Sequence, residues 1–424
     1  MIFLALAVVP AVLLVMGVPI FAVLMVATLG GLLLSINPVQ AIHSAMFGSL
    51  DIFPLLAVPL FILAGDIMSR GGIARRLIDL TLSVIGAIRG ALGIATIAAC
   101  EVFSVMSGSS VACVAAIGKT MIPSLRKNGY GHTFPVCLVT ATGVIDIITP
   151  PSITMIIYGI VAQQSVPQLF LAGFPAGILI GVALALYVVW YARRKNIPVT
   201  APEERRSVRA AFKDAIWSLF APVVIFGGIY GGLFTPTEAA GVACIYAIVI
   251  SLFVHREITW RELWAITVDS AALSAQVLII VSAAGAFAWL ITTSGYPQQL
   301  VTFVGSLKLE PWMLLLTINV ILLFVGSVLE PPAAILLLTP LITPIVYAAG
   351  IDPIHFGIIV TVNLAIGMFT PPFGLNLFAA NALFKTPLPE LYRGVMPFFF
   401  IYLAMLMLIT YVPAITLAPL KLFR

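Results

Sequence analysis

Two Thr-Pro-Pro sequences interrupt long apolar segments, and they are the strongest candidates for sites that bind small ions. They lie at residues 149–151 and 370–372. Proline lacks an amide hydrogen and clashes with the preceding helical turn, so a Pro-Pro pair must break a helix. Where such a break lies in lipid, the freed carbonyl and amide groups must face protein, water or an ion. Two breaks in corresponding places of two halves therefore predict a pair of buried sites.

Each break follows an apolar segment that has polar residues at its middle. Segment 91–125 has Ser-Gly-Ser-Ser at residues 107–110, and segment 311–349 has Glu-Pro-Pro at residues 330–332. Each leg has about 15 residues, which gives roughly 22 Å of helix, too short for a hydrocarbon core of about 30 Å. We therefore predict two hairpins that enter and leave the membrane by one side, with polar tips inside it.

The predicted sites lie where each hairpin tip meets the break of its own half. Hydroxyl and carbonyl oxygens with few carboxylates suit sodium better than a transition metal. The candidate sodium ligands are Ser104, Ser107, Gly143, Ile147, Thr149, Pro150, Gly326, Gly367 and Thr370. The amide ends of the broken helices carry partial positive charge, which suits an anion. The candidate substrate-binding residues are Ser107, Gly108, Ser109, Ser110, Ser152, Glu330 and Asn376.

Three carboxylates, Glu101, Asp146 and Glu330, fall in apolar surroundings. A charge there costs about 2.5 to 3.5 kcal/mol on insertion scales, which disfavours chance retention. Glu330, at a predicted tip, is the best candidate ligand of the three. Glu101 and Asp146 either take part in a site or only pair within the protein. A single break is more often a packing feature than a ligand site, but two breaks at equal spacing favour sites.

The composition indicates that this chain is surrounded largely by lipid rather than by water. It is 62% hydrophobic and 9% charged, with a mean hydropathy of +1.17. A soluble chain of this length would have too little polar surface to cover itself. The net charge of +5 could suggest nucleic acid, but the basic residues lie in loops between apolar segments rather than in one patch. We predict an all-α polytopic membrane protein that binds no nucleic acid, with its four cysteines as packing residues.

The two halves repeat one plan. Pro123 precedes the first Thr-Pro-Pro by as many residues as Pro344 precedes the second. This internal duplication predicts a first repeat at residues 1–195, with hairpin 91–125 and broken helix 132–161. A cytoplasmic loop at 196–213 separates it from a second repeat at 214–424, with hairpin 311–349 and broken helix 354–383.

The remaining apolar segments predict the other helices. We expect spans at residues 2–16, 18–35, 53–68, 169–192, 216–233, 239–254, 269–291 and 395–415. Residues 37–51 are expected as a polar connection, 73–89 as an interfacial helix and 256–263 as a short surface helix. The first run, from Ile2, is expected to be a spanning helix rather than a removed signal peptide.

The positions of the basic residues orient the chain. If residues 70–89 lie in the cytoplasm, nearly all Lys and Arg residues fall on the cytoplasmic side, as the positive-inside rule requires. Both termini are then periplasmic. The second half starts inside where the first starts outside, so the repeats are inverted, as in many secondary transporters.

Several motifs together resemble the large membrane subunit of tripartite ATP-independent periplasmic (TRAP) transporters. They lie at residues 60–65, 107–112, 150–152, 234–240 and 370–374. The resemblance implies sodium-coupled uptake of a small organic acid at the bacterial inner membrane, with no cofactor besides the coupling ion. It also implies a small four-helix membrane subunit, a periplasmic substrate-binding protein and an elevator movement against a scaffold. It associates Ser107, Ser109, Ser110 and Ser152 with sodium and substrate.

Three rival functions remain open from the sequence. A proton-coupled anion carrier would use Asp146 or Glu330. A channel would need a continuous polar pathway, whereas both hairpins are predicted to end at mid-depth. An intramembrane enzyme would need a nucleophile beside a base, but the four histidines fall near segment ends, far from the serine tip. No catalytic residue is therefore expected.

Overall fold

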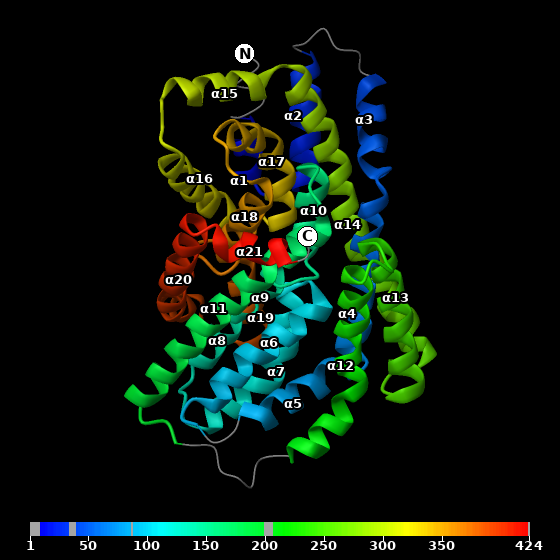
Figure 1. Cartoon of the computed structure of the whole chain (residues 1–424), viewed down its shortest axis with the longest axis vertical. Coiled ribbons are helices and arrows are strands. Elements are labelled where there is room, and N and C mark those ends of the chain that lie inside the picture. Colours follow the sequence, from blue (N-terminus) through cyan, green and yellow to red (C-terminus); the bar gives the residue numbers. More distant parts are fainter. Residues whose placement is uncertain (1–8, 34–39, 86–87, 199–206, 423–424) are drawn as a thin grey trace.

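The computed structural model describes residues 9–33, 40–85, 88–198 and 207–422, and every regular element within these ranges is a helix. Lipid-facing backbone must satisfy its hydrogen bonds within its own segment, which explains why so apolar a chain folds into helices. The helices run mostly along the long axis of the molecule (Figure 1). The structure thus confirms an all-α polytopic fold.

The first half of the chain supplies the elements up to the helix that precedes the long basic loop. They are α1 (Val9–Val15), α2 (Ile20–Leu33), α3 (Gln40–Leu50), η2 (Phe53–Leu56), α4 (Ala57–Arg70), α5 (Ile73–Ile85), α6 (Ala91–Ser107), α7 (Ser110–Lys127), α8 (Phe134–Thr142), α9 (Ile145–Ile148), α10 (Ile153–Val161) and α11 (Val166–Arg194).

The second half begins after residues 199–206, which lie outside the described ranges. Its elements are α12 (Val208–Tyr230), α13 (Pro236–Val249), η4 (Ile250–Val254), α14 (Trp260–Thr293), α15 (Tyr296–Ser306), α16 (Pro311–Gly326), α17 (Pro331–Ala348), α18 (Pro353–Gly367), α19 (Leu375–Phe384), α20 (Leu388–Tyr411) and α21 (Ala414–Leu422).

Among the described residues, eight helical segments are long and apolar enough to cross a membrane. The hairpin helices α6 and α16 and both pieces of the second broken helix, α18 and α19, are apolar but shorter. The lengths of α6 and α16 agree with the short hairpin legs expected from the sequence, whereas α17, the other leg of the second hairpin, is among the eight long helices.

The two hairpin segments lie toward opposite ends of the molecule, α6 and α7 with α5 at one end and α16 and α17 with α15 at the other (Figure 1). Helices α6 and α7 pack closely on each other. Helix α16 instead packs mainly on α18, and α17 packs on α10, α14 and α15. The second hairpin therefore has its tip where the sequence predicted it, but its two legs diverge. The inverted relation of the two halves stays a prediction.

The helices fall into two groups by their packing. Helix α14 packs on α2, α3 and α4, and α13 packs on α4 and α12, which makes one group. Helix α11 packs on α6, α18, α20 and α21, which makes the centre of the other group. Contacts of α4 with α6 and of α14 with α17 join the two groups. The hairpins and breaks belong to the second group.

Residues 40–50 correct one expectation: they form helix α3 rather than a polar connection. Ile42 is buried, and α3 packs along α14. The approach is close because Gly285 of α14 has no side chain, and a Cβ there would meet Ser49. The contact with α14 buries one face of this helix, in which apolar and polar residues are mixed.

A second correction concerns residues 256–263, which form no separate surface helix. Thr259 and Glu262 make a capping box at the start of α14, which then continues for 34 residues. No proline or glycine pair breaks the helix before Thr293. The cap therefore starts the spanning helix nine residues earlier than hydropathy predicted. Helix α15 was not predicted.

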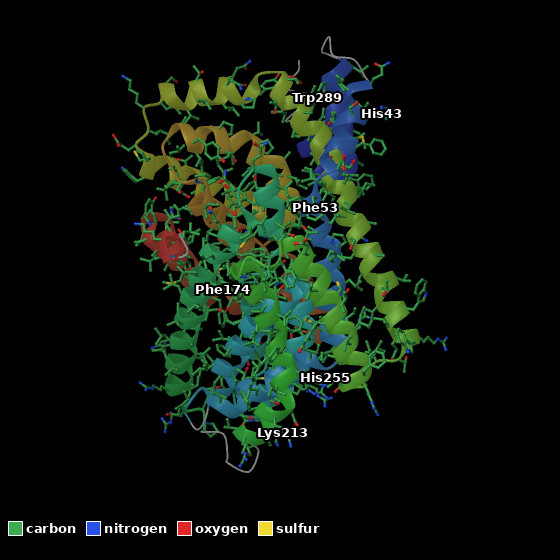
Figure 2. The ribbon with its side chains drawn as sticks, turned by 45° about the vertical axis from the view of Figure 1, so that its right-hand side comes forward. His43, Phe53, Phe174, Lys213, His255 and Trp289 are labelled. Carbon is green, nitrogen blue, oxygen red and sulfur yellow. The ribbon has the colours of Figure 1, made fainter. Side chains whose placement is uncertain are left out.

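Labelled side chains mark the two ends of the molecule, and an ion pair lies at one of them. Lys213 and His255 lie at one end, and His43 and Trp289 lie at the other (Figure 2). At the end with Lys213 and His255, Arg76 of α5 forms a 2.7 Å ion pair with Glu257. This pair holds the amphipathic helix α5 against the turn before α14. The interfacial position of α5 in the membrane stays a prediction.

Candidate functional site

Both Thr-Pro-Pro sequences break a helix, as the sequence predicted. The first break separates α9 from α10, and the second separates α18 from α19. Each contains a cis peptide bond between its two prolines. After the first break, Ser152 is the N-cap residue of α10 and its Oγ accepts a hydrogen bond from the Met155 amide. The same hydroxyl donates a 2.5 Å hydrogen bond to the Ile147 carbonyl.

The tip of the first hairpin is a turn built by Gly108 and two capping serines. Gly108 has a φ of +61°, which favours glycine. Ser109 caps α7 by accepting from the Ala112 amide, and Ser107 Oγ accepts from the Ser109 amide. A Cβ on Gly108 would touch Ile153 and the Pro151 carbonyl. The first tip therefore lies directly against the first break.

A residue of the second half also reaches the first hairpin. Ser110 Oγ donates a 3.0 Å hydrogen bond to Asn376 Oδ1, and Asn376 Nδ2 donates to the Thr140 carbonyl at 3.5 Å. The Asn376 amide donates to the Met368 carbonyl within the second break. Asn376 is fully buried. The sequence placed each site within its own half, but this contact shows that the second break also holds the first hairpin.

The second tip meets the second break through two glycines. A Cβ on Gly367 would overlap the carbonyl group of Gly326, so the two backbones touch directly. Thr370 Oγ1 donates to the Ile366 carbonyl at 2.6 Å, and Ser327 Oγ donates to the Phe324 carbonyl at 2.8 Å. The helix ends α16 and α18 thus place backbone carbonyls side by side, which is the kind of oxygen set that sodium prefers.

A cavity of about 490 Å³ lies between the two tips. It is lined by both tips, both breaks and two helices of the other packing group. The lining residues are Ile62, Asp66, Ser107, Gly108, Ser109, Ser110, Val111, Ala112, Ala115, Ile147, Ile153, Thr154, Leu273, Val277, Glu330, Pro331, Pro332, Met368 and Leu375. Its walls are mostly apolar with a few hydroxyl and carboxylate groups, which is typical of a small-molecule site.

Most of the substrate-binding candidates meet at this cavity. Ser107, Gly108, Ser109, Ser110 and Glu330 line it. Asn376 lies behind the wall, where it supports Ser110. Ser152 is fully buried and its hydroxyl is committed to the cap of α10, so the structure does not bring it to the cavity.

The sodium candidates divide between the two breaks. Ser107 and Ile147 line the cavity, and Ser104 and Thr149 lie behind the first tip, where both bond to Glu101. A Cβ on Gly143 would touch the Ser110 carbonyl, which places Gly143 against the first tip. Pro150 is buried in the first break. Gly326, Gly367 and Thr370 lie at the second break.

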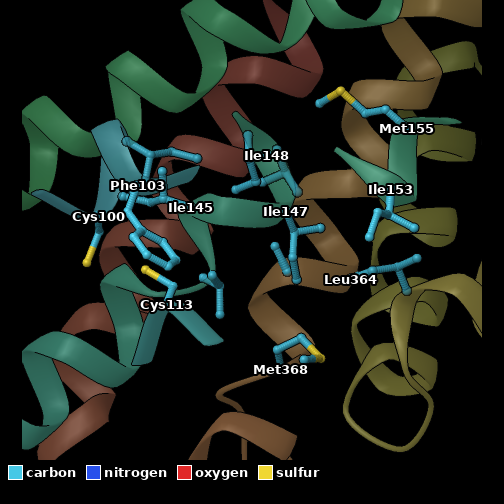
Figure 3. Close-up of a cluster of buried hydrophobic side chains, with 14 of the residues drawn as sticks. Cys100, Phe103, Cys113, Ile145, Ile147, Ile148, Ile153, Met155, Leu364 and Met368 are labelled. Carbon is cyan, nitrogen blue, oxygen red and sulfur yellow. The ribbon is translucent and has the colours of Figure 1, made fainter. Parts of the chain in front are cut away.

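Apolar side chains surround the first break and hold it in place. Figure 3 shows Ile145, Ile147, Ile148 and Ile153 gathered with Phe103, Leu364 and Met368. Because such close packing resists displacement, the positions of the break carbonyls are set by the core around them. The four cysteines are buried, as expected of packing residues.

Asp146 is an exception within this apolar core. It is fully buried, and no side chain of the described residues donates a hydrogen bond to either carboxylate oxygen; among those residues, the Gly108 backbone amide at the first tip is the one donor that acts on it. A buried carboxylate with so little compensation fits a place that a cation or proton occupies. Among the described residues, no group of three His, Cys, Asp or Glu side chains could hold a metal ion.

The sequence reasoning missed the cavity wall formed by α4 and α14. Asp66 lines the cavity and accepts a 2.7 Å hydrogen bond from Ser270. A charged residue inside the span predicted at residues 53–68 was the sequence feature that could have identified Asp66 as a site residue. Leu273 and Val277 of α14 gave no such signal, because apolar residues are expected in any membrane-spanning helix.

Comparisons with known proteins agree with these features. A family model described as "Tripartite ATP-independent periplasmic transporter, DctM component" matches residues 7–415. A C4-dicarboxylate TRAP transporter large permease protein, DctM of Pseudomonas aeruginosa, is 41% identical over 387 residues, which is 91% of each chain. An isethionate TRAP transporter permease protein, DctMQ of Oleidesulfovibrio alaskensis, is 40% identical over 407 residues. That alignment covers 96% of this chain and 64% of the longer relative.

A solved structure shares the fold without close sequence similarity. The YdaH transporter of Alcanivorax borkumensis superimposes with a TM-score of 0.67 at 14% identity, and the match covers 90% of each chain. At this identity the likeness concerns the fold alone.

Proposed function

The chain belongs to the family of DctM components of tripartite ATP-independent periplasmic transporters, and we propose that it carries a small organic anion inward together with sodium ions. In this proposal the ions bind where each hairpin tip meets a break. The anion binds in the cavity between the tips. The single observation that carries the proposal is that one cavity joins both tips and both breaks.

Sodium as the coupling ion is supported by the ligand chemistry. The breaks offer backbone carbonyls and the hydroxyls of Ser107, Thr149 and Thr370, which are hard oxygen ligands. Ions bound there would fix the tips against the breaks and so complete the cavity. The buried carboxylate of Asp146, which no side chain of the described residues bonds, lies beside the first break and would gain a nearby positive charge.

An anionic substrate is supported by the helix ends and by the relatives. Helices α7 and α17 begin at the cavity, at Ser110 and Pro331, and the start of a helix carries partial positive charge. The relatives compared here are named for a C4-dicarboxylate and for isethionate, both of which are small organic anions.

Transport is proposed to occur by an elevator movement with two partners. The group that contains the hairpins and breaks would move across the membrane against the group of α2, α3, α4, α12, α13 and α14. A periplasmic binding protein would deliver the anion, and a small four-helix membrane subunit would complete the complex in the bacterial inner membrane. Nearly all Lys and Arg side chains would face the cytoplasm, with both termini periplasmic.

Reconstitution tests this function. The chain, its small membrane subunit and the matching binding protein are placed with proteoliposomes, and uptake of labelled succinate and of isethionate is measured. We expect uptake of at least one anion to require both the binding protein and an inward sodium gradient. Uptake that a pH gradient alone drives, without sodium, would contradict sodium coupling and favour a proton-coupled carrier that uses Asp146 or Glu330.

A further inference from the structure

Glu101 of α6 contacts the proposed first sodium site, although the sequence analysis did not include it among the candidate ligands. Thr149 Oγ1 donates a 2.9 Å hydrogen bond to Glu101 Oε2. Ser104 Oγ donates a 2.6 Å hydrogen bond to the main-chain carbonyl of Glu101. Glu101 therefore touches two of the proposed sodium ligands, one through its side chain and one through its backbone.

Helix α11 leaves a niche that fits this carboxylate. Gly177 and Gly181 are one helical turn apart and face it from the same side of α11. A Cβ at Gly177 would overlap Thr149 Oγ1, and a Cβ at Gly181 would lie 2.5 Å from Glu101 Oε1. Any residue other than glycine at these positions would displace the Glu101–Thr149 pair.

The carboxylate has no cation of its own. Glu101 Oε1 is buried without a hydrogen-bond partner, and no cationic side chain in the described ranges acts on this group. An isolated charge at membrane depth is unfavourable, and a neighbouring cation relieves it. Carboxylate and hydroxyl oxygens suit an alkali ion. The place for that ion is beside Oε1 and the break at Thr149.

The second half offers an internal comparison. Ser327 bonds the carbonyl of Phe324 just as Ser104 bonds the carbonyl of Glu101, three residues earlier in each case. The same local hydrogen bond thus recurs with an exposed aromatic side chain in place of the partly buried Glu101. At this position, three residues before the serine, only the first half carries a charge.

Given the proposed sodium coupling, on which this inference rests, we propose that Glu101 supplies the negative charge of the first sodium site. Both carboxylate oxygens lie in the glycine niche of α11: Oε2 accepts from Thr149, and Oε1, which has no hydrogen-bond partner among the described residues, is the oxygen left to bind the ion. The first site therefore binds sodium through a buried carboxylate, and the second site binds it through carbonyls and hydroxyls.

Sodium-dependent thermal stability of the complex in nanodiscs tests this role without any need for a substrate. The unfolding midpoint is measured against sodium chloride, with choline chloride keeping the ionic strength constant. Glu101→Gln keeps the size and an oxygen acceptor for Thr149 but removes the charge. We expect the sodium concentration for half-maximal stabilisation to rise at least tenfold.

A matched control is available on the surface. Thr133 Oγ1 donates a 2.9 Å hydrogen bond to Glu390 Oε2 at an exposed position. Glu390→Gln makes the same chemical change in the same kind of pair, so its sodium titration should match the wild type. Glu101→Asp, which restores the charge, should recover part of the lost affinity.

The outcomes separate this role from a structural one and from the proposed function. A structural role for Glu101 would lower the midpoint equally at every sodium concentration and leave the titration unchanged, which would overturn the proposal. If Glu101→Gln does not fold, Gly181→Ala keeps the charge but crowds Oε1, and an unchanged sodium titration there would also overturn it. A wild-type complex without any sodium response would refute the sodium coupling together with this inference.

Discussion

At the scale of single residues, the hydrogen bond between Ser110 and Asn376 joins the first hairpin to the second break. Both side chains are buried, and Asn376 also bonds the Thr140 carbonyl. Removing one partner leaves the other without a hydrogen bond, which costs about 1 to 3 kcal/mol. The two halves of the site are therefore coupled through one side-chain contact.

Asn376→Ala is expected to lower the free energy of unfolding by about 1 to 3 kcal/mol. In the double variant with Ser110→Ala, the loss should be smaller than the sum of the two single losses, because the shared bond is removed only once. Reversible unfolding in denaturing detergent measures this cycle. Additive losses, to within about 0.5 kcal/mol, would show that the two residues act independently.

Gly367 provides a second test at this scale. Gly367→Ala would push the second tip away from the second break, because the new Cβ overlaps the Gly326 carbonyl. We expect sodium-dependent uptake to fall at least tenfold, since misplacing a ligand set by about 1 Å can cost about a hundredfold in rate. Gly305→Ala on α15, where a Cβ has nothing within 4 Å, is the control and should transport normally. Normal uptake by Gly367→Ala would exclude this contact from the mechanism.

At the scale of elements, proline and glycine gave the clearest information. The Pro-Pro pairs placed both breaks, and Ser107 to Ser110 placed the first tip, because these residues restrict or free the backbone locally. The divergence of α16 from α17 could not be predicted, because it depends on the packing of α16 on α18 and of α17 on α10. The helix α3 was missed for a related reason: its sequence mixes apolar and polar residues, and its packing on α14 cannot be read from the sequence.

The start of α14 depends on its capping box. Thr259 Oγ1 accepts from the Glu262 amide, and the Glu262 carboxylate accepts from the Thr259 amide. Thr259→Ala should destabilise the protein by about 1 kcal/mol, because first-turn amides of α14 lose a partner. Thermal unfolding measures the change, with Thr302→Ala as the control. Thr302 lies on exposed α15 and bonds only the Gln298 carbonyl one turn earlier. An equal effect of both substitutions would contradict a special role for the cap.

At the scale of the whole molecule, the orientation in the membrane can be tested with cysteines. The four native cysteines are buried, so an added surface cysteine should dominate labelling. Lys213 lies at one end of the molecule (Figure 2), and helix α15, which contains Gln298, lies at the other (Figure 1). In intact cells an impermeant maleimide should label Gln298→Cys, and it should label Lys213→Cys only after permeabilisation. The reverse pattern would contradict the cytoplasmic placement of the basic loops.

Only part of the candidate site could be predicted from the sequence, because the rest is assembled by packing between distant segments. Serine and glutamate residues in the middle of the apolar segments predicted the tips, because polar groups in lipid are unfavourable unless they have a functional or structural partner. The opposite wall, with Asp66, Leu273 and Val277, is brought to the tips by contacts far apart in the sequence. Hydropathy cannot tell which face of an apolar helix such as α14 meets a cavity. The capping role of Ser152 was likewise visible only in the structure.

The central claim is that sodium fixes the hairpin tips and so completes an anion cavity between them. Its most direct test is the rate at which a thiol reagent modifies Ser109→Cys, which lines that cavity, in the complete complex. We predict that sodium alone changes the rate, and that the transported anion protects the cysteine only when sodium is present. Protection by the anion in potassium as strong as in sodium, or a rate indifferent to sodium, would contradict the account.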